Sequence, residues 1–146
     1  MLTFRVPGNP RPKPRAKVTK RGNFLPAAYL EWRDAVADEA AVACLAAQND
    51  GRPWRVDAEA YALRCVFHMP DRRCKDLDNA TGGVMDALTR AGLWPDDHLV
   101  DSLTASKVFG SGWSGVVVTV VALPDGWRSR QVDDVWAALE QRREAA

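Results

Sequence analysis

Carboxylate side chains stand in two short segments of the chain, Asp76-Leu77-Asp78-Asn79 and Asp96-Asp97. If residues 76–78 are extended, Asp76 and Asp78 point to the same side and Leu77 turns into the core. Asp97 joins the pair if the chain folds back after the intervening helix. Carboxylate oxygens select Mg²⁺ or Mn²⁺ over Zn²⁺, and such an ion polarises a phosphoryl oxygen and generates hydroxide near neutral pH. The alternative is structural: Asp76 and Asp78 cap a helix, and Asp96-Asp97 is a turn.

Positive charge is concentrated at the start of the chain. Residues 1–30 hold seven Lys and Arg side chains and no Asp or Glu, so the rest carries −6 against an overall +1. Prolines at 7, 10, 12 and 14 exclude a helix and keep the backbone extended. This basic arm, residues 7–25, suits a polyanionic partner, and the alternative is a solvated tail. The candidate nucleic-acid contacts are Arg11, Lys13, Arg15 and Lys17 in the arm and Arg72, Arg73 and Lys75 before Asp76.

Hydrophobic periodicity predicts the elements that must position these groups. Strands are expected at 2–6, 58–69, 99–109 and 115–123, and helices at 26–48, 79–91 and about 132–145. The last two strands are expected to form a hairpin through the loop at 110–114. The valine run at 116–121 is typical of a central strand buried on both faces. The order predicts one α/β (α+β) domain over residues 1–146, with a mixed sheet of about four strands, two main helices and a C-terminal helix.

Length and composition restrict the class of protein. The chain has 146 residues, 47% hydrophobic and 27% charged, which is ordinary for one globular domain. The longest apolar run, residues 40–47, is far shorter than the ~20 residues of a membrane helix, so no membrane partner is expected. The first seven residues lack an apolar signal region. Cys44, Cys65 and Cys74 have no Cys-x-x-Cys spacing, which favours free thiols in a reducing cytoplasm.

Residues 67–79 read FHMPDRRCKDLDN and residues 85–97 read MDALTRAGLWPDD. Together these two segments resemble the RusA family of Holliday junction resolvases, and the similarity covers roughly residues 60–123. The resemblance implies a small α/β homodimer that nicks four-way DNA junctions symmetrically with Mg²⁺ or Mn²⁺, in recombination and repair. It implies that Asp76, Asp78 and Asp97 are the catalytic, metal-binding aspartates. Family members are often phage-encoded, and a two-fold dimer suits a two-fold junction.

The sequence departs from the family at Gly82. The family usually has a catalytic lysine there, four residues after the second aspartate of the motif, and such a cation stabilises a negatively charged transition state. A second hypothesis is therefore a branched-DNA-binding protein that cleaves weakly or not at all. Lys75, Lys107 and Lys13 are candidate replacements for the missing lysine. A third hypothesis, a small-molecule phosphohydrolase, gives the arm no role.

Several residues around the motif can be interpreted either as structural or as functional. Gly82 and Gly83 each destabilise a helix interior by about 1 kcal/mol relative to Ala, so tertiary packing must support the helix. Asp86 lies on the same helix face as Asp78 and either supports it or is solvated. Trp94 is expected to anchor a turn in the core after a left-handed Gly92. Trp113, in a glycine-rich loop, is a candidate for touching DNA.

Overall fold

The computed structural model covers residues 1–146 and describes all of them except 15–17, 20–21, 24, 73–75, 130–134 and 139–146. The strands are β1 (Leu2–Pro7), β2 (Val18–Thr19), β3 (Gly22–Asn23), β4 (Tyr61–Met69), β5 (Val100–Phe109) and β6 (Gly115–Ala122). The helices are α1 (Ala27–Asn49) and α2 (Leu77–Arg90), with 3-10 turns η1 (Asp97–Leu99) and η2 (Trp127–Ser129). Residues 135–138 form a short C-terminal helix, and the rest of the helix predicted at 132–145 lies outside the described residues.

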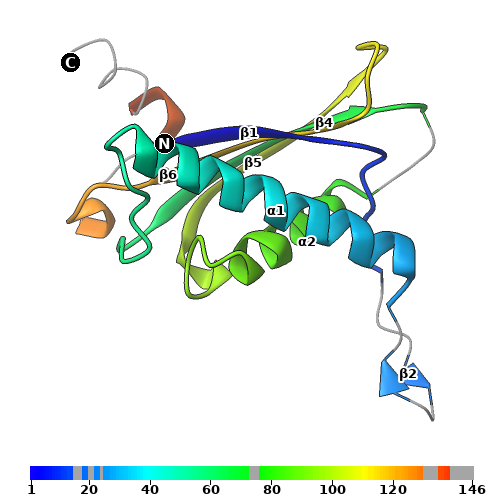
Figure 1. The fold of residues 1–146 in the computed structure, drawn as a ribbon, viewed down its shortest axis with the longest axis horizontal. Helices are drawn as coiled ribbons and strands as arrows, with labels where there is room; N and C mark the ends of the chain where they lie inside the picture. The colour runs from blue at the N-terminus through cyan, green and yellow to red at the C-terminus, as the bar shows by residue number, and fades with distance from the viewer. Residues whose placement is uncertain (15–17, 20–21, 24, 73–75, 130–134, 139–146) are drawn as a thin grey trace.

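One mixed sheet organises the described part of the chain. Its strand order is β1-β6-β4-β5, and α1 and α2 lie side by side across one face (Figure 1). β4 and β5 are parallel and α2 connects them, while β6 runs antiparallel to both of its neighbours. The predicted α+β fold with a four-stranded mixed sheet is therefore confirmed. Of the described helices, none has the length and apolar character needed to cross a bilayer.

The predicted hairpin of β5 and β6 is wrong, because β4 lies between these two strands. The loop at 110–114 passes the end of β4 to connect β5 with β6. These two strands are two strand spacings apart, or about 10 Å, which five residues span easily. Burial explains the arrangement. β6 has fully buried Val116, Val118 and Val120, as expected of a central strand, whereas β5 exposes half of Leu103 and suits the edge.

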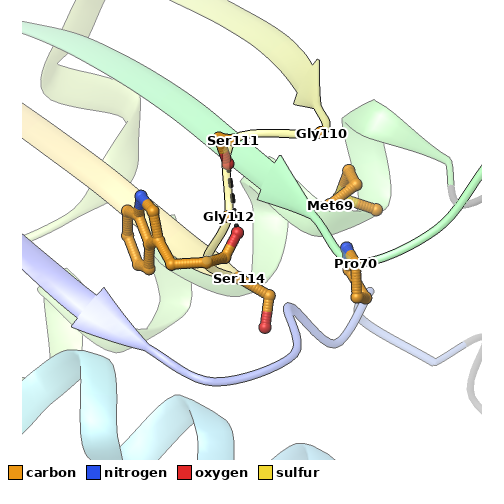
Figure 2. A pocket seen from close by; sticks show the side chains of 7 residues that line it. Met69, Pro70, Gly110, Ser111, Gly112 and Ser114 are labelled. Carbon is orange, nitrogen blue, oxygen red and sulfur yellow. Dashed lines mark hydrogen bonds between the residues drawn. The ribbon is translucent and has the colours of Figure 1, made fainter.

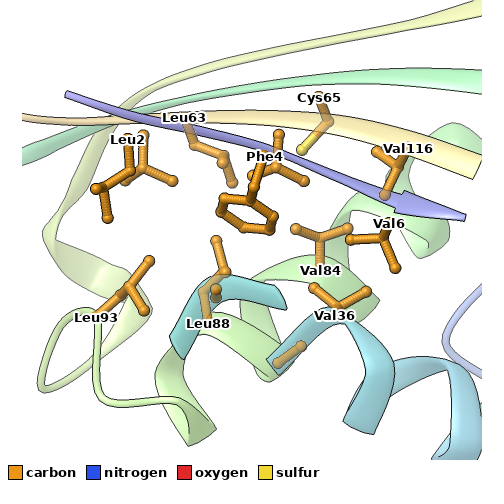
Figure 3. Packing of buried hydrophobic residues seen from close by; sticks show 14 of the residues in the cluster. Leu2, Phe4, Val6, Val36, Leu63, Cys65, Val84, Leu88, Leu93 and Val116 are labelled. Atoms are coloured by element: carbon orange, nitrogen blue, oxygen red, sulfur yellow. The ribbon is translucent and has the colours of Figure 1, made fainter. Parts of the chain in front are cut away.

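The main core fills the space between the sheet and the two helices (Figure 3). Phe4, Leu63 and Val116 come from three strands and pack with Val36 of α1 and Leu88 of α2. A second cluster covers the opposite face of β4 and β6, where the alternate side chains point. Its members are Ala60, Ala62, Val121, Leu123 and Trp127, with Val135, Trp136 and Ala138 packed against them. The valine run therefore contributes to both faces of the sheet.

A short connection returns the chain from α2 to β5. Gly92 has φ +74°, the left-handed conformation that glycine favours, and the Leu93 N–H donates to the Leu88 carbonyl at 3.0 Å. Trp94 is buried, and its indole N–H donates to the Thr89 hydroxyl at 2.7 Å. The roles predicted for Gly92 and Trp94 are thus confirmed. Together these contacts fix the start of η1, and with it Asp97.

Candidate functional site

Asp76 and Asp78 stand at the start of α2, immediately after the end of β4. Asp76 is the N-cap residue with extended backbone, but α2 begins at Leu77, so the extended backbone expected through residue 78 is wrong. Leu77 packs against the core, as expected. Both carboxylates are exposed, and the Asp76 side chain makes no capping hydrogen bond but accepts one from the Asn79 amide at 3.2 Å. The positive end of the helix dipole favours the negative charge of both groups.

Asp97 lies at the other end of α2, in η1 ahead of β5. α2 has 14 residues, which corresponds to about 21 Å of helix between the two positions. Among the described residues, no three His, Cys, Asp or Glu side chains are grouped closely enough to hold a metal ion. The structure therefore brings Asp76 and Asp78 together but leaves Asp97 apart from them within one chain.

Asp96, the neighbour of Asp97, is held in place by His98. The His98 backbone N–H donates to Asp96 Oδ1 at 2.9 Å, and His98 Nδ1 lies 2.8 Å from the same oxygen. The pKa of Asp96 lies below its ordinary value, chiefly because of the hydrogen bond from the His98 backbone and secondly because of the hydrogen bond to the His98 side chain. Asp96 is thus the N-cap of η1, in the segment where the structural interpretation expected a turn.

The arm is docked on α2 at Lys13. The backbone N–H of Lys13 donates to the carbonyl of Asn79 at 2.9 Å, in the first turn of α2. Pro10 is buried, while the side chains of Arg11 and Lys13 are exposed. The solvated tail is therefore excluded for residues 7–13. Two of the predicted DNA contacts in the arm, Arg15 and Lys17, lie outside the described residues.

The two glycines of α2 make room for this docking. A Cβ atom on Gly83 would lie 3.3 Å from both the Trp32 and the Tyr29 rings and 3.5 Å from the Arg11 carbonyl. A Cβ atom on Gly82 would meet only the Lys13 side chain, at 3.9 Å from its Cδ. α1 and the arm therefore pack closely against α2 at Gly83, and the Lys13 side chain lies over the helix at Gly82. This packing supplies the tertiary support that the glycine pair requires.

Asp86 anchors the arm. The Lys13 ammonium lies 2.9 Å from Asp86 Oδ2, and the Tyr29 hydroxyl donates to the same oxygen at 3.2 Å. Burial and the neighbouring Asp86 charge raise the pKa of Tyr29 to about 12. Asp86 is therefore a structural partner of the arm and not a freely solvated helix residue. The sequence analysis missed Tyr29, whose position three residues after a helix-starting proline gave no sign of this contact.

A hollow of about 280 Å³ opens where β4 ends, and Figure 2 shows the residues around it. Met69 and Pro70 form one side, and the loop from Gly110 to Ser114 forms the other. The Trp113 ring is stacked on His68 at 4.7 Å between centroids, so one face of this candidate DNA contact is already covered. Nearby, the Arg72 guanidinium lies 5.6 Å from the Phe109 ring. The other two predicted loop cations, Arg73 and Lys75, lie outside the described residues.

Comparison with known proteins decides the family. The profile described as Endodeoxyribonuclease RusA matches residues 7–121, which include the docked arm, both strands flanking α2, and all three aspartates. This chain belongs to the RusA family. A protein named Crossover junction endodeoxyribonuclease RusA from Escherichia coli O139:H28 is 40% identical over 63 residues, 43% of this chain and 52% of that protein. Proteins of the same name from Escherichia coli K12 and Enterobacteria phage 82 are 57% identical over 38 residues, 26% of this chain and 32% of each relative.

The RusA family profile matches a longer part of the chain than the alignments with individual relatives do. The chain spans about a third to a half of the length of these curated relatives in the matched segments. The profile extends the likeness back to residue 7, so the basic arm is part of the RusA-family region and not an appendage to it. In this RusA-family chain the arm contacts α2 through Lys13, whose backbone N–H donates to Asn79 in the helix turn that follows Asp76.

Proposed function

We propose that this RusA-family chain is a structure-selective endonuclease that resolves four-way DNA junctions by paired, symmetric nicks in recombination and repair. The observation that carries the proposal is the docking of a cationic arm on the helix that begins with Asp76 and Asp78. The arm brings Arg11 and Lys13 to the side of α2, where phosphates of a bound strand meet them. A small-molecule phosphohydrolase would have no use for such an arm.

The carboxylates at the start of α2 suit a hard divalent cation, and we assign Mg²⁺ to them, with Mn²⁺ as a substitute. Both side chains are exposed, and within the described residues the Asp78 carboxylate accepts no hydrogen bond. Their oxygens therefore remain available as ligands, and two like charges at one turn of helix favour a cation between them. When bound, the ion would polarise the scissile phosphate and lower the pKa of a bound water.

A homodimer would supply the third carboxylate. β5 is the edge of the main sheet, and beside it an apolar hollow of about 490 Å³ is lined by Leu77, Met85, Leu103 and Ala105. A second copy related by a two-fold axis across this face would run its β5 antiparallel to the first. The start of one β5, where Asp97 stands, would then lie beside the end of the other, where α2 begins. We therefore propose that Asp97 of one copy completes the site of Asp76 and Asp78 in the other.

A second candidate function is branched-DNA binding with weak or absent cleavage, because Gly82 provides no side chain beside Asp78. The two functions differ in one measurement, since only the endonuclease nicks a bound junction. The proposed location is the cytoplasm, where the free thiols of Cys44 and Cys65 would stay reduced. Burial raises the pKa of the Cys65 thiol to about 12, so this cysteine is an inert core residue.

The deciding experiment uses the purified chain, an end-labelled four-way junction and a linear duplex of the same sequence. Symmetric nicks should appear on the junction with Mg²⁺ and not on the duplex, and they should vanish in EDTA and in Asp78→Asn. Asp57→Asn, a change at an exposed carboxylate on the loop before β4, is the matched control and should nick normally. Gel-shift binding without nicks under any divalent ion would establish the second candidate instead.

A further inference from the structure

We propose that Lys13 provides the phosphate-contacting cation of the active site, reaching it from the arm across the bare backbone of Gly82. The inference rests on the proposed nuclease function and names a catalytic residue for it. Water would add to the phosphorus, one P–O ester bond would break, and the departing sugar oxygen would take up a proton. The Lys13 ammonium would stabilise the additional negative charge on the phosphoryl oxygens during this exchange.

The first support is the course of the Lys13 side chain along α2. Its backbone is fixed to the first turn by the hydrogen bond to Asn79, and its Cδ lies 3.9 Å from the position of a Cβ atom on Gly82. Asp78, Gly82 and Asp86 are spaced at four-residue intervals and share one face of the helix. The lysine stem therefore lies between the two acidic positions, one turn after Asp78, in space that a side chain at residue 82 would otherwise fill.

The second support is the ion pair that holds the ammonium in the absence of DNA. Lys13 Nζ lies 2.9 Å from Asp86 Oδ2, with 51% of the lysine side chain and 33% of the aspartate side chain exposed. An ion pair this open to solvent contributes little to stability. Asp86 itself is fixed by the Tyr29 hydroxyl, so the lysine is the partner that can move. A phosphate oxygen offers Lys13 a charge-assisted hydrogen bond of comparable length, and rotation of the lysine stem turns the ammonium from Asp86 toward Asp78.

Lys107 is the rival candidate, because it follows Leu103 and Ala105 on the face of β5 that packs beside α2. It belongs to β5, however, and among the described residues outside α2 only Lys13 lies within 4 Å of the position of a Cβ atom on Gly82. The two lysines therefore make different predictions about Gly82. If Lys13 is the active-site cation, a lysine introduced at position 82 would occupy the place of its side chain and substitute for it.

The test measures two quantities on the full chain: the single-turnover nicking rate with enzyme in excess, and the Kd for the junction by gel shift without a divalent ion. Lys13→Ala should lower the nicking rate by about 100-fold and raise the Kd by no more than about threefold. The double variant Lys13→Ala with Gly82→Lys should recover the rate to within about tenfold of the wild type. Arg52→Ala removes one exposed cation at the far end of α1 and should change neither quantity.

The outcomes separate this inference from the proposed function. If the wild-type chain nicks and Lys13→Ala nicks at the same rate, or if only Lys107→Ala loses the rate, the assignment to Lys13 is wrong and the nuclease stands. If the rate falls but Gly82→Lys does not restore it, while both variants melt at the wild-type temperature, Lys13 acts as an anchor of the arm and the assignment is also wrong. If the wild-type chain binds the junction and never nicks it, the nuclease itself is wrong.

Discussion

The Lys13 ammonium and the Asp86 carboxylate lie 2.9 Å apart although 73 residues separate them in the chain. This pair joins the basic arm to the second helix of the fold. Lys13 also hydrogen-bonds through its backbone to Asn79, so two contacts two helical turns apart align the arm with α2. The arm is consequently held against α2 at Lys13, on the helix that begins with Asp76 and Asp78.

The two glycines of α2 give opposite predictions for the same substitution. Gly83→Ala should lower the free energy of unfolding by about 1–2 kcal/mol, because the new methyl group meets the buried Trp32 and Tyr29 rings at 3.3 Å. Gly82→Ala should raise it by up to about 1 kcal/mol, because the nearest atom is 3.9 Å away and alanine favours the helix. Urea unfolding of both variants measures the difference. Equal effects at the two positions would contradict the close packing of α1 and the arm at Gly83.

The contact between Tyr29 and Asp86 predicts a titration. Asp86→Asn should lower the pKa of Tyr29 from about 12 toward its ordinary value, because the acidic charge that disfavours the phenolate is removed. Tyrosinate absorbance against pH measures this, and Asp50→Asn at the end of α1 is the matched control. With the folded pKa raised above the unfolded pKa near 10, stability falls as pH rises between about 10 and 12. That fall should be shallower in Asp86→Asn, and an unchanged Tyr29 titration would show that burial alone sets this pKa.

Local patterns predicted most of the fold because they depend on neighbouring residues. The helix stop at Gly92, the buried Trp94 and the central valine strand follow from backbone preference and side-chain periodicity. The pairing of β5 is different, since the short loop at 110–114 is compatible with a hairpin and also with a passage across β4. The choice is made by burial: a strand with half-exposed Leu103 is stable at an edge, and the valine strand is stable in the centre.

The candidate site was only partly predictable for the same reason. The acidic motif located Asp76 and Asp78, and the proline pattern located the arm, but no period in one sequence connects Lys13 with Asp86 or Gly83 with Trp32. Those pairs exist because the arm crosses α2 in three dimensions. The separation of Asp97 from Asp78 by the length of α2 likewise depends on the parallel course of β4 and β5, which the sequence order left open.

The exposed cation of Arg11 predicts a salt effect on DNA binding. Each phosphate that a protein side chain neutralises contributes about 0.9 to the slope of log affinity against log salt concentration on duplex DNA. Arg11→Ala should therefore weaken junction binding at low salt and reduce that slope by about 0.9. Arg52→Ala, which removes a cation paired with Asp50 at the far end of α1, should leave the slope unchanged. A wild-type slope in Arg11→Ala would show that this residue contacts no phosphate.

The proposed sharing of Asp97 between two copies predicts complementation between inactive variants. Asp78→Asn and Asp97→Asn should each abolish nicking alone. In a mixed dimer, however, the intact Asp76 and Asp78 of one copy meet the intact Asp97 of the other. Random mixing makes half of the dimers mixed, each with one complete site, so about a quarter of the wild-type sites should return. Because the second site of each mixed dimer lacks both groups, the recovered activity should consist of single nicks and not of paired ones.

A matched mixture distinguishes shared sites from trivial recovery. Asp76→Asn mixed with Asp78→Asn should stay inactive, because these two carboxylates stand in the same turn of one chain and no pairing of the variants restores both. If Asp97 served its own chain, the first mixture would be equally inactive, since neither copy would hold all three aspartates. Recovery in the first mixture but not in the second therefore requires that Asp97 act in the site of the partner copy. Within one chain the 14 residues of α2 separate Asp97 from Asp78, and in the proposed dimer the same separation places Asp97 beside the Asp78 of the other copy.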